Sequence, residues 1–430
     1  MTYQPRRFGT AARLLVVVLL TGAGAGLGGI ALTLLLHLVQ HLAYGHTEDT
    51  FLRGVEQASV VRRVLVMTVG GAAVGIGWWL LRSLRPRQPS VADGVQEPGR
   101  PARLPVSTLD AGLQIVAVGL GASLGREGAP RQVGAALGSW LAGRARLTPA
   151  QRSTVVACGA GAGLAAVYNV PLSGALFTLE VLLRSARPRH VVPAALSSAV
   201  ATAIALLVLP DAPTYDATGL AVTGPLLLFA VLIGPVAAGV GAMFGQVMAA
   251  ARAHRPGTGR LPVTVPGAFA IVGALAAGYP ELLGNGKGLT QIALTGRPAL
   301  LLLAAVLVLK PLATALCLSS GANGGLLTPA LATGAVLGAL SGRGWELLLP
   351  GTAPGGYALV TATAVLATTQ RAPLTALALG LELTHATGAL LVPMALATAV
   401  AYGCTALWRA SRSREPGGWS GRRDQLNRGG

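Results

Sequence analysis

An acid and two bases stand in a part of the chain that otherwise avoids charge. In Gly121–Ser139, which reads GASLGREGAPRQVGAALGS, the residues Arg126, Glu127 and Arg131 are surrounded mainly by glycine, alanine and serine. An ionisable side chain within an apolar segment indicates a function by default. A carboxylate there can take up a proton, or compete with a small anion for one electropositive site. The alternative interpretation is a structural pair of Arg126 and Glu127 near a membrane interface.

The segments around these residues are long and apolar enough to cross a bilayer. The chain has 430 residues, of which 52% are hydrophobic and 11% charged, and its mean hydropathy is +0.61. A soluble domain carries about 25% charged residues. The apolar runs are continuous rather than alternating, which excludes a transmembrane β-barrel. We therefore expect an all-α polytopic membrane protein, with the first run, Leu14–Thr47, retained as a membrane helix.

Positive charge is concentrated at the chain ends and between the apolar runs. The formal net charge is +18, and arginines cluster at positions 6–13, 82–87, 144–146, 184–189 and 409–423. This distribution follows the positive-inside rule and predicts an inner or plasma membrane protein with both termini in the cytoplasm. No basic stripe alternates with aromatic residues, so nucleic-acid binding is not expected. The cysteines lie singly, and no disulfide, metal site or cofactor is expected.

Two pairs of segments repeat each other. The segment GREGAPRQVGAALG at Gly125–Gly138 matches GLLTPALATGAVLG at Gly325–Gly338, at an offset of 200 residues. The segment VPLSGALFTLE at Val170–Glu180 matches APLTALALGLE at Ala372–Glu382, at an offset of 202. Such duplication is typical of transporters whose two halves enclose a site near the midplane. We expect a duplicated, inverted-repeat helical fold with broken helices that meet there.

The glycines and prolines of these repeats indicate helices that begin inside the membrane. The first N–H groups of such a helix lack partners, and the helix dipole adds about half a positive charge, so the end attracts an anion. Glycines permit close approach to the main chain, and proline is tolerated in the first turn. In the first repeat Gly125–Gly128 contains Glu127, and in the second Gly324–Leu327 precedes Pro329. We expect the two ends to bind one desolvated halide, with Glu127 as its competitor.

These segments resemble those of the CLC family of chloride channels and proton/chloride antiporters. Gly125-Arg126-Glu127-Gly128, followed by Ala129-Pro130, is similar to the family's GREGP gate segment, with the proline displaced by one position. Gly325-Leu326-Leu327-Thr328-Pro329 resembles the GxFxP segment, with leucine in place of phenylalanine. Further similar segments are LCLSSGANGG (Leu316–Gly325), QRAPLTALALGLELT (Gln370–Thr384) and YNVPLSGALFTLE (Tyr168–Glu180). The resemblance covers roughly residues 12–405.

The resemblance implies a protein that moves chloride, with protons as a possible second substrate. It implies a homodimer in the lipid bilayer with one pore in each subunit. Glu127 would be the gating glutamate, and Leu326 and Leu327 would donate their main-chain N–H groups to chloride. The anion-binding residues expected in these segments are Gly125, Arg126, Gly128, Gly325, Leu326 and Leu327.

Three departures from the family pattern bear on mechanism. The GSGIP selectivity segment has no clean match; spacing puts Pro86 at the ion-facing serine, and Ser90 is the nearest hydroxyl that could replace it. The inner proton-relay glutamate of the antiporters, directly after the position of Glu180, is Val181 here. This weakens the case for tight proton coupling, although Glu180 or water could substitute. The pore tyrosine of the last helix is missing, because Tyr402 belongs to the preceding helix.

The domain organisation is predicted from the apolar runs. Residues 1–408 are expected to form one transmembrane domain, with halves at about 12–190 and 220–405 and a polar linker at 82–103. Residues 409–430 are expected to be a basic, disordered cytoplasmic tail. No soluble regulatory domain is expected.

Other ionisable residues have structural interpretations. The segment Ser107–Asp110 resembles a capping box, so Asp110 is expected to cap a helix. Lys310 could extend to an interface or pair with Glu281. Glu382 corresponds to the glutamate of the first repeat, and a role in capping or bridging helices fits it as well as an ion role.

Chloride transport, as a channel or a proton/chloride antiporter, is the function most compatible with these observations. A fluoride or other anion exporter of the same fold is an alternative, because the selectivity segment is unusual. A membrane enzyme is not expected, since the GxGxxG pattern at Gly24–Gly29 lies in an apolar helix without a preceding strand and no catalytic cluster is visible. The remaining alternative is a structural membrane protein that transports nothing.

Overall fold

The regular elements of the chain are helices, arranged in two halves. The computed structural model describes residues 5–45, 51–85, 89–99 and 102–413. The first half contains α1 (Pro5–Tyr44), α2 (Phe51–Gln57), α3 (Val60–Leu84), α4 (Val91–Gln96), α5 (Leu104–Gly119), α6 (Gly128–Arg144), α7 (Pro149–Tyr168), α8 (Pro171–Phe177) with its π-helical continuation η1 (Thr178–Leu183), and α9 (Pro188–Ala205).

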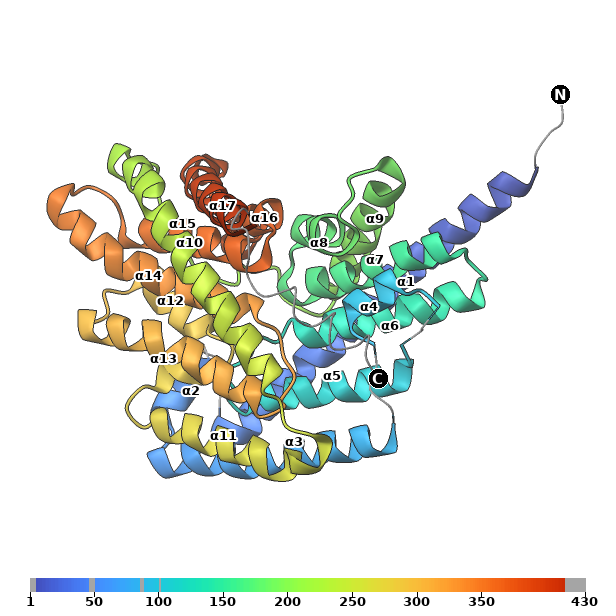
Figure 1. Cartoon of the computed structure of the whole chain (residues 1–430), viewed down its shortest axis with the longest axis horizontal. Helices are drawn as coiled ribbons and strands as arrows, with labels where there is room; N and C mark the ends of the chain where they lie inside the picture. The colour runs from blue at the N-terminus through green and yellow to red at the C-terminus, as the bar shows by residue number, and fades with distance from the viewer. Residues whose placement is uncertain (1–4, 46–50, 86–88, 100–101, 414–430) are drawn as a thin grey trace, which may run out of the picture.

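The second half follows the same order of long and short helices. It contains α10 (Gly224–Ala253), η2 (Thr258–Arg260), α11 (Leu261–Leu275), η3 (Pro280–Leu282), α12 (Lys287–Thr295), α13 (Leu300–Ser319), α14 (Leu327–Leu348), α15 (Pro354–Gln370), α16 (Pro373–Thr384), η4 (Gly388–Leu390) and α17 (Leu391–Ser413). Figure 1 shows α3 and α11 side by side at the bottom of the view, with α8–α9 and α16–α17 at the top.

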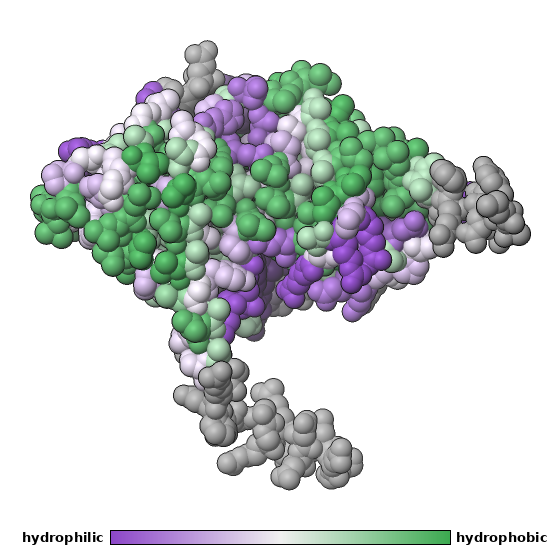
Figure 2. Space-filling model, turned by 90° about the horizontal axis from the view of Figure 1, so that it is seen from above, coloured by the Kyte–Doolittle hydropathy of each residue, from purple (hydrophilic) through white to green (hydrophobic). Residues whose placement is uncertain are grey.

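Several helices have the length and composition of membrane spans. Within the described residues, six segments are long and apolar enough to cross a bilayer: Ala11–Tyr44, Val60–Leu84, Gly224–Ala253, Thr258–Leu275, Leu300–Ser319 and Gly388–Ser411. On the face drawn in Figure 2, hydrophobic residues form a band across the middle, with hydrophilic residues above and below it. Such a band is what contact with the hydrocarbon of a bilayer requires.

The helices of each half break at equivalent places. α7 ends at Asn169 and α15 ends at Arg371, each in the left-handed conformation with φ of 55°. Pro171 and Pro373 then begin the next helices, where a missing N–H is tolerated. The repeated sequence segments therefore correspond to a repeated helix break, in which a left-handed residue ends one helix and proline begins the next.

Glycine brings the central helices into close contact. Gly134 of α6 and Gly159 of α7 face each other, and a Cβ on either would overlap the main chain of the other. In the second half, a Cβ at Gly338 of α14 would overlap the carbonyl oxygen of Tyr357 in α15. Small residues permit such close packing where no hydrophobic effect drives helices together in lipid.

Three local expectations need correction. The capping box at Ser107–Asp110 is wrong, because α5 begins earlier, after its N-cap Arg103, and both Ser107 and Asp110 are buried within the helix. The polar linker at 82–103 is partly helical, since α3 continues to Leu84 and α4 lies inside the linker. The tail expected from residue 409 begins later, because α17 extends to Ser413; residues 414–430 lie outside the described part.

Candidate functional site

The two repeats meet at a pair of glycines. Gly125 and Gly325 form an isolated antiparallel bridge, in which each main-chain N–H donates to the carbonyl oxygen of the other over 2.8 Å. The bridge lies just before the first turns of α6 and α14. The equivalent N-termini of the two halves therefore converge on one place in the interior, as the repeat predicted.

Glu127 places its carboxylate at this convergence. The residue is fully buried, and its Oε1 accepts a hydrogen bond from the main-chain N–H of Leu327 over 2.7 Å. Its Oε2 accepts from the Thr328 hydroxyl over 2.9 Å and from the Tyr168 hydroxyl over 3.4 Å. One N–H and two hydroxyl groups thus hold the negative charge, and these are also donors that a halide would use.

Glycine at the bridge leaves room for the carboxylate. A Cβ at Gly125 or at Gly325 would overlap the carboxylate of Glu127. At Gly128, a Cβ would come within 2.7 Å of the Gln114 Oε1 atom. The wall of the site is therefore main chain on both sides, and an anion can approach it closely.

The two arginines hold the segment around Glu127 rather than pairing with its carboxylate. Arg126 donates from Nη2 to the Val167 carbonyl oxygen over 3.1 Å, and its guanidinium lies 4.6 Å from the centre of the Tyr168 ring. Arg131 donates from Nε to the main-chain oxygen of Glu127 over 2.8 Å. The alternative of an Arg126–Glu127 structural pair is not what the structure contains.

A second buried carboxylate lies behind the site. Asp110 Oδ1 accepts from Trp78 Nε1 over 2.9 Å and from Asn323 Nδ2 over 3.1 Å. Its Oδ2 accepts from Gln114 Nε2 over 2.9 Å and from Gln132 Nε2 over 3.0 Å. Asp110 therefore ties α3, α5 and α6 to the segment that precedes α14, a structural role quite different from the predicted helix cap.

Lys310 is also fully buried, and its ammonium group neither extends to an interface nor pairs with Glu281. Its Nζ donates to the carbonyl oxygens of Leu282 and Gly284, over 2.8 and 2.7 Å. Gly284 in turn donates its N–H to the Gly121 carbonyl oxygen over 2.7 Å. The lysine thus fixes the turn before α12 instead of reaching an interface or pairing with Glu281.

Two of the remaining expected site residues, Glu180 and Ser90, contact other parts of the chain. The Glu180 carboxylate accepts hydrogen bonds from the first turn of α16, at Leu374 and Thr375. The Ser90 hydroxyl caps α4 by accepting from the Asp93 N–H over 3.1 Å, and Ser90 is exposed. Pro86 lies outside the described residues.

The site contains two leucines that were predicted to bind the anion and two hydroxyl groups that were not predicted. Leu327 already presents its N–H at the site, and Leu326 is the N-cap of α14. Tyr168 and Thr328 touch the carboxylate, yet no role for them was predicted; both stood in recognised segments, as hydroxyls beside the helix breaks. Tyr402 lies within α17, the last helix of the described residues.

Comparison with known proteins points in one direction. The family model described as "Voltage gated chloride channel" matches residues 70–406. A "Putative chloride channel protein ClcB-like" of Ralstonia nicotianae is 33% identical over 354 residues, covering 75% of this chain and 77% of the relative. The "Voltage-gated ClC-type chloride channel ClcB" of Escherichia coli O81 is 32% identical over 324 residues, covering 73% and 76%.

Solved structures share the fold. A "slow cyanobacterial Cl-/H+ antiporter" superposes with a TM-score of 0.78 at 21% identity, over 96% of this chain and all of that one. A "CLC-type fluoride/proton antiporter" gives a TM-score of 0.72 at 22% identity, over 94% of this chain and 96% of that one. These likenesses confirm the all-helical, multi-span membrane fold predicted from the repeats.

Proposed function

The chain belongs to the CLC family of voltage-gated chloride channels and Cl−/H+ antiporters, and we propose that Glu127 is the gate of its chloride pathway. It is a multi-pass membrane protein of a transport family, not an enzyme. The observation that carries the proposal is the position of the Glu127 carboxylate on the N-terminus of α14, against the bridge of Gly125 and Gly325.

The gate works by competition between two anions. The ionised carboxylate takes the donors that chloride needs, because a charge-assisted hydrogen bond is about twice as strong as a neutral one. When Glu127 binds a proton it loses that advantage, leaves the site, and chloride takes its place. The main-chain N–H groups of Leu326 and Leu327 then bind the ion. Gly125, Gly128 and Gly325 give it room, while Arg126 supplies positive potential.

Chloride is the ion that the relatives' names support. Both curated relatives described above carry chloride in their names, whereas the fluoride/proton antiporter is similar at the level of fold alone. We therefore propose chloride as the substrate and keep fluoride as the ion to test next. Ser90 is left out of the proposed site, because its hydroxyl caps α4.

Proton coupling is proposed to be weak. Val181 stands at the position where the resemblance places an inner proton-relay glutamate, and it has no titratable group. The neighbouring Glu180 is engaged by two N–H groups and a hydroxyl of α16. Glu180 is therefore engaged as the cap of α16, which is a structural role.

Exposed leucines and the distribution of arginines support proposals for the assembly and the topology. We propose a homodimer that uses the face formed by α8 and α16, where Leu172 and Leu374 are 56% and 57% exposed. These leucines occupy equivalent places in the two repeats, so one patch is apolar on both halves. We also propose that both chain termini face the cytoplasm, on the basis of the arginine distribution.

The test is flux from liposomes loaded with chloride, with external chloride and pH recorded together. Wild type should release chloride faster as the pH falls below 7, and Glu127→Ala should release it at a rate that does not change over that acidic range. Glu346→Gln is the matched control, since this acid pairs with the exposed Arg297 and should leave the pH dependence intact. Absence of chloride flux from folded wild-type protein at every pH would contradict the proposal. A dependence on pH below 7 that survives in Glu127→Ala would remove Glu127 from the gate.

A further inference from the structure

A large cavity opens at the end of α6 opposite to Glu127. Its volume is about 1340 Å³, and it lies between the last turn of α3, the first turn of α5, the end of α6 and the first turns of α7. The nearest lining residue of α6 is Ser139, twelve residues after Glu127, so at 1.5 Å per residue the cavity begins about 18 Å from the glutamate. It is therefore a feature separate from the proposed gate.

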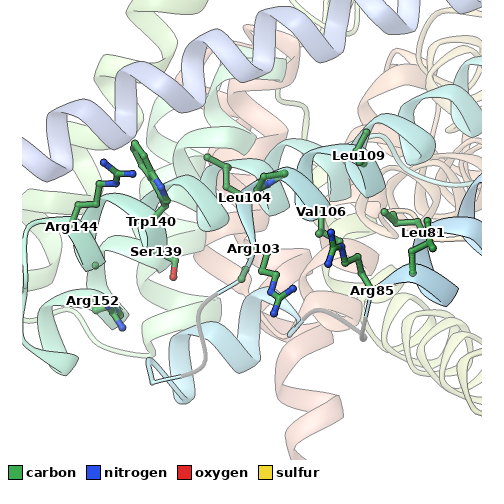
Figure 3. A pocket seen from close by; sticks show the side chains of 14 residues that line it. Leu81, Arg85, Arg103, Leu104, Val106, Leu109, Ser139, Trp140, Arg144 and Arg152 are labelled. Carbon is green, nitrogen blue, oxygen red and sulfur yellow. The ribbon is translucent and has the colours of Figure 1, made fainter.

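Four arginines from different elements line this cavity. Arg85 and Arg103 come from the ends of α3 and α5 that flank the segment between them, and Arg144 and Arg152 come from α6 and α7. Figure 3 shows Arg144 and Arg152 at one end of the lining, with their side chains turned away from each other, Arg103 near the middle and Arg85 farther along. Among the described lining residues there is no aspartate or glutamate. The cavity is thus suited to a ligand with at least two negative charges.

One of these arginines has an unsatisfied donor. Arg152 donates from Nη1 to the Pro98 carbonyl oxygen over 3.0 Å, but its buried Nε has no hydrogen-bond partner among the described residues. The absence of a side chain at Gly143 leaves room for the guanidinium, since a Cβ there would lie 2.9 Å from Nη2. This Nε is closed to solvent, so Arg152 meets the cavity through the other atoms of its side chain.

The rest of the lining is apolar and has the character of a membrane interface. Leu84 and Leu109 are 73% and 61% exposed, at the end of a membrane-spanning helix and beside it. Trp140 is 42% exposed, and the Arg144 guanidinium lies 4.5 Å from the centre of its ring. Tryptophan beside arginine is typical of the headgroup level of a bilayer. The ligand should therefore have apolar chains as well as negative charge.

We propose that this cavity binds an anionic phospholipid whose headgroup carries two phosphates. The four arginines together would hold the two phosphates, since the planar fork of arginine matches phosphate oxygens. The acyl chains would lie along Leu84, Leu109 and Trp140. Basic pockets between membrane helices are suited to such headgroups. The C-terminal segment 409–430 is a poor occupant, because it holds six arginines and two acids and would be repelled.

Native mass spectrometry of the delipidated protein in detergent tests this proposal. The probes are cardiolipin with two phosphates, phosphatidylglycerol with one, and phosphatidylcholine with no net charge. Cardiolipin should bind most tightly. Arg144→Gln should weaken it about tenfold, the value of one charge-assisted contact. Arg260→Gln is the matched control. Arg260 is an exposed arginine at the end of η2, which packs against α3, and it lies outside the cavity. Its substitution should leave cardiolipin binding unchanged.

Three outcomes would overturn the proposal. Equal retention of cardiolipin and phosphatidylglycerol would exclude the two-phosphate headgroup. Equal loss in Arg144→Gln and Arg260→Gln would exclude this cavity as the site. Displacement of the lipid by millimolar inorganic phosphate would assign the arginines to a free anion. Arg103→Gln near the middle of the lining gives an independent variant if Arg144→Gln fails to fold. Because the readout is bound lipid rather than flux, the result does not depend on Glu127 being the gate.

Discussion

Glu180 and Glu382 each cap the N-terminus of the helix that leads to the other. Glu180 accepts from the N–H groups of Leu374 and Thr375 over 3.1 and 2.8 Å. Glu382 accepts from those of Leu172 and Ser173 over 2.9 and 2.7 Å. The two halves of the chain are thus joined by a reciprocal pair of carboxylate caps. This finding explains why the repeated segments contain a proline nine residues before a glutamate.

Loss of one cap should lower stability without removing the gate. Glu382→Ala leaves two N–H groups of α8 without a charged acceptor, and we expect a loss of about 1–2 kcal/mol in the free energy of unfolding. Thermal unfolding in detergent measures the loss, and Glu346→Ala serves as the comparison, because its pair with Arg297 is exposed. Equal melting temperatures for the two variants would contradict a capping role for Glu382.

The bridge glycine should control the position of the gate. Gly325→Ala places a Cβ where the Glu127 carboxylate lies, so the carboxylate must leave and chloride release should depend less on pH. Gly344→Ala, in α14, meets no atom within 4 Å and should behave as wild type. In a Glu127→Ala background the Gly325→Ala change should have little further effect on flux. A large additional effect there would mean that Gly325 acts through something other than the carboxylate.

Lys287 should make chloride flux sensitive to mildly alkaline pH. Its side chain reaches solvent, yet the surrounding protein desolvates the ammonium group, and this together with the charge of Arg126 lowers the pKa of Lys287 to about 8. Below that pH the lysine is charged and attracts anions; above it the charge is lost, so flux should fall between pH 7 and 9. The measurement belongs in the Glu127→Ala background, where the gate does not titrate. Lys287→Met should abolish the fall, and a decline that persists in that variant would exclude Lys287.

The exposed leucines of α8 and α16 should support the dimer. Leu374→Trp enlarges a side chain that is 57% exposed and should shift the protein toward the monomer in light scattering after size-exclusion chromatography. Leu301→Trp is the comparison, since Leu301 is 80% exposed at the start of α13, away from this face. A dimer that persists in Leu374→Trp at nanomolar concentration would place the interface elsewhere.

Much of the site could be predicted from the sequence because the repeat carries its own geometry. Matching Gly125 with Gly325 at a constant offset predicts that two equivalent helix ends meet, and the structure has them bridged. Glu127 is buried because it directly follows the segment that forms this bridge. Such inferences succeed because they need only the local conformation of each segment and the relation between the two halves.

Long-range partners could not be predicted in the same way. Three of the four donors around Asp110 come from other elements, and Asn323 is 213 residues away. A local capping pattern was therefore the only signal available at Ser107–Asp110, and it was misleading because α5 starts a turn earlier. Lys310 was misread for a similar reason, since carbonyl oxygens that accept its hydrogen bonds carry no side-chain signature in a sequence.

The bridge of Gly125 and Gly325 has one more consequence, which concerns how freely this chain can change. The site beside the bridge is lined by main-chain peptide groups, and every amino acid except proline supplies the same peptide N–H. Leu326 and Leu327 can therefore be exchanged for other residues with little loss of the groups that face the ion. The two glycines and one glutamate have no such substitutes. Substitutions at Leu326 and Leu327 should leave pH-dependent chloride release intact, whereas substitutions at these three positions should alter it. Saturation mutagenesis would display that contrast directly.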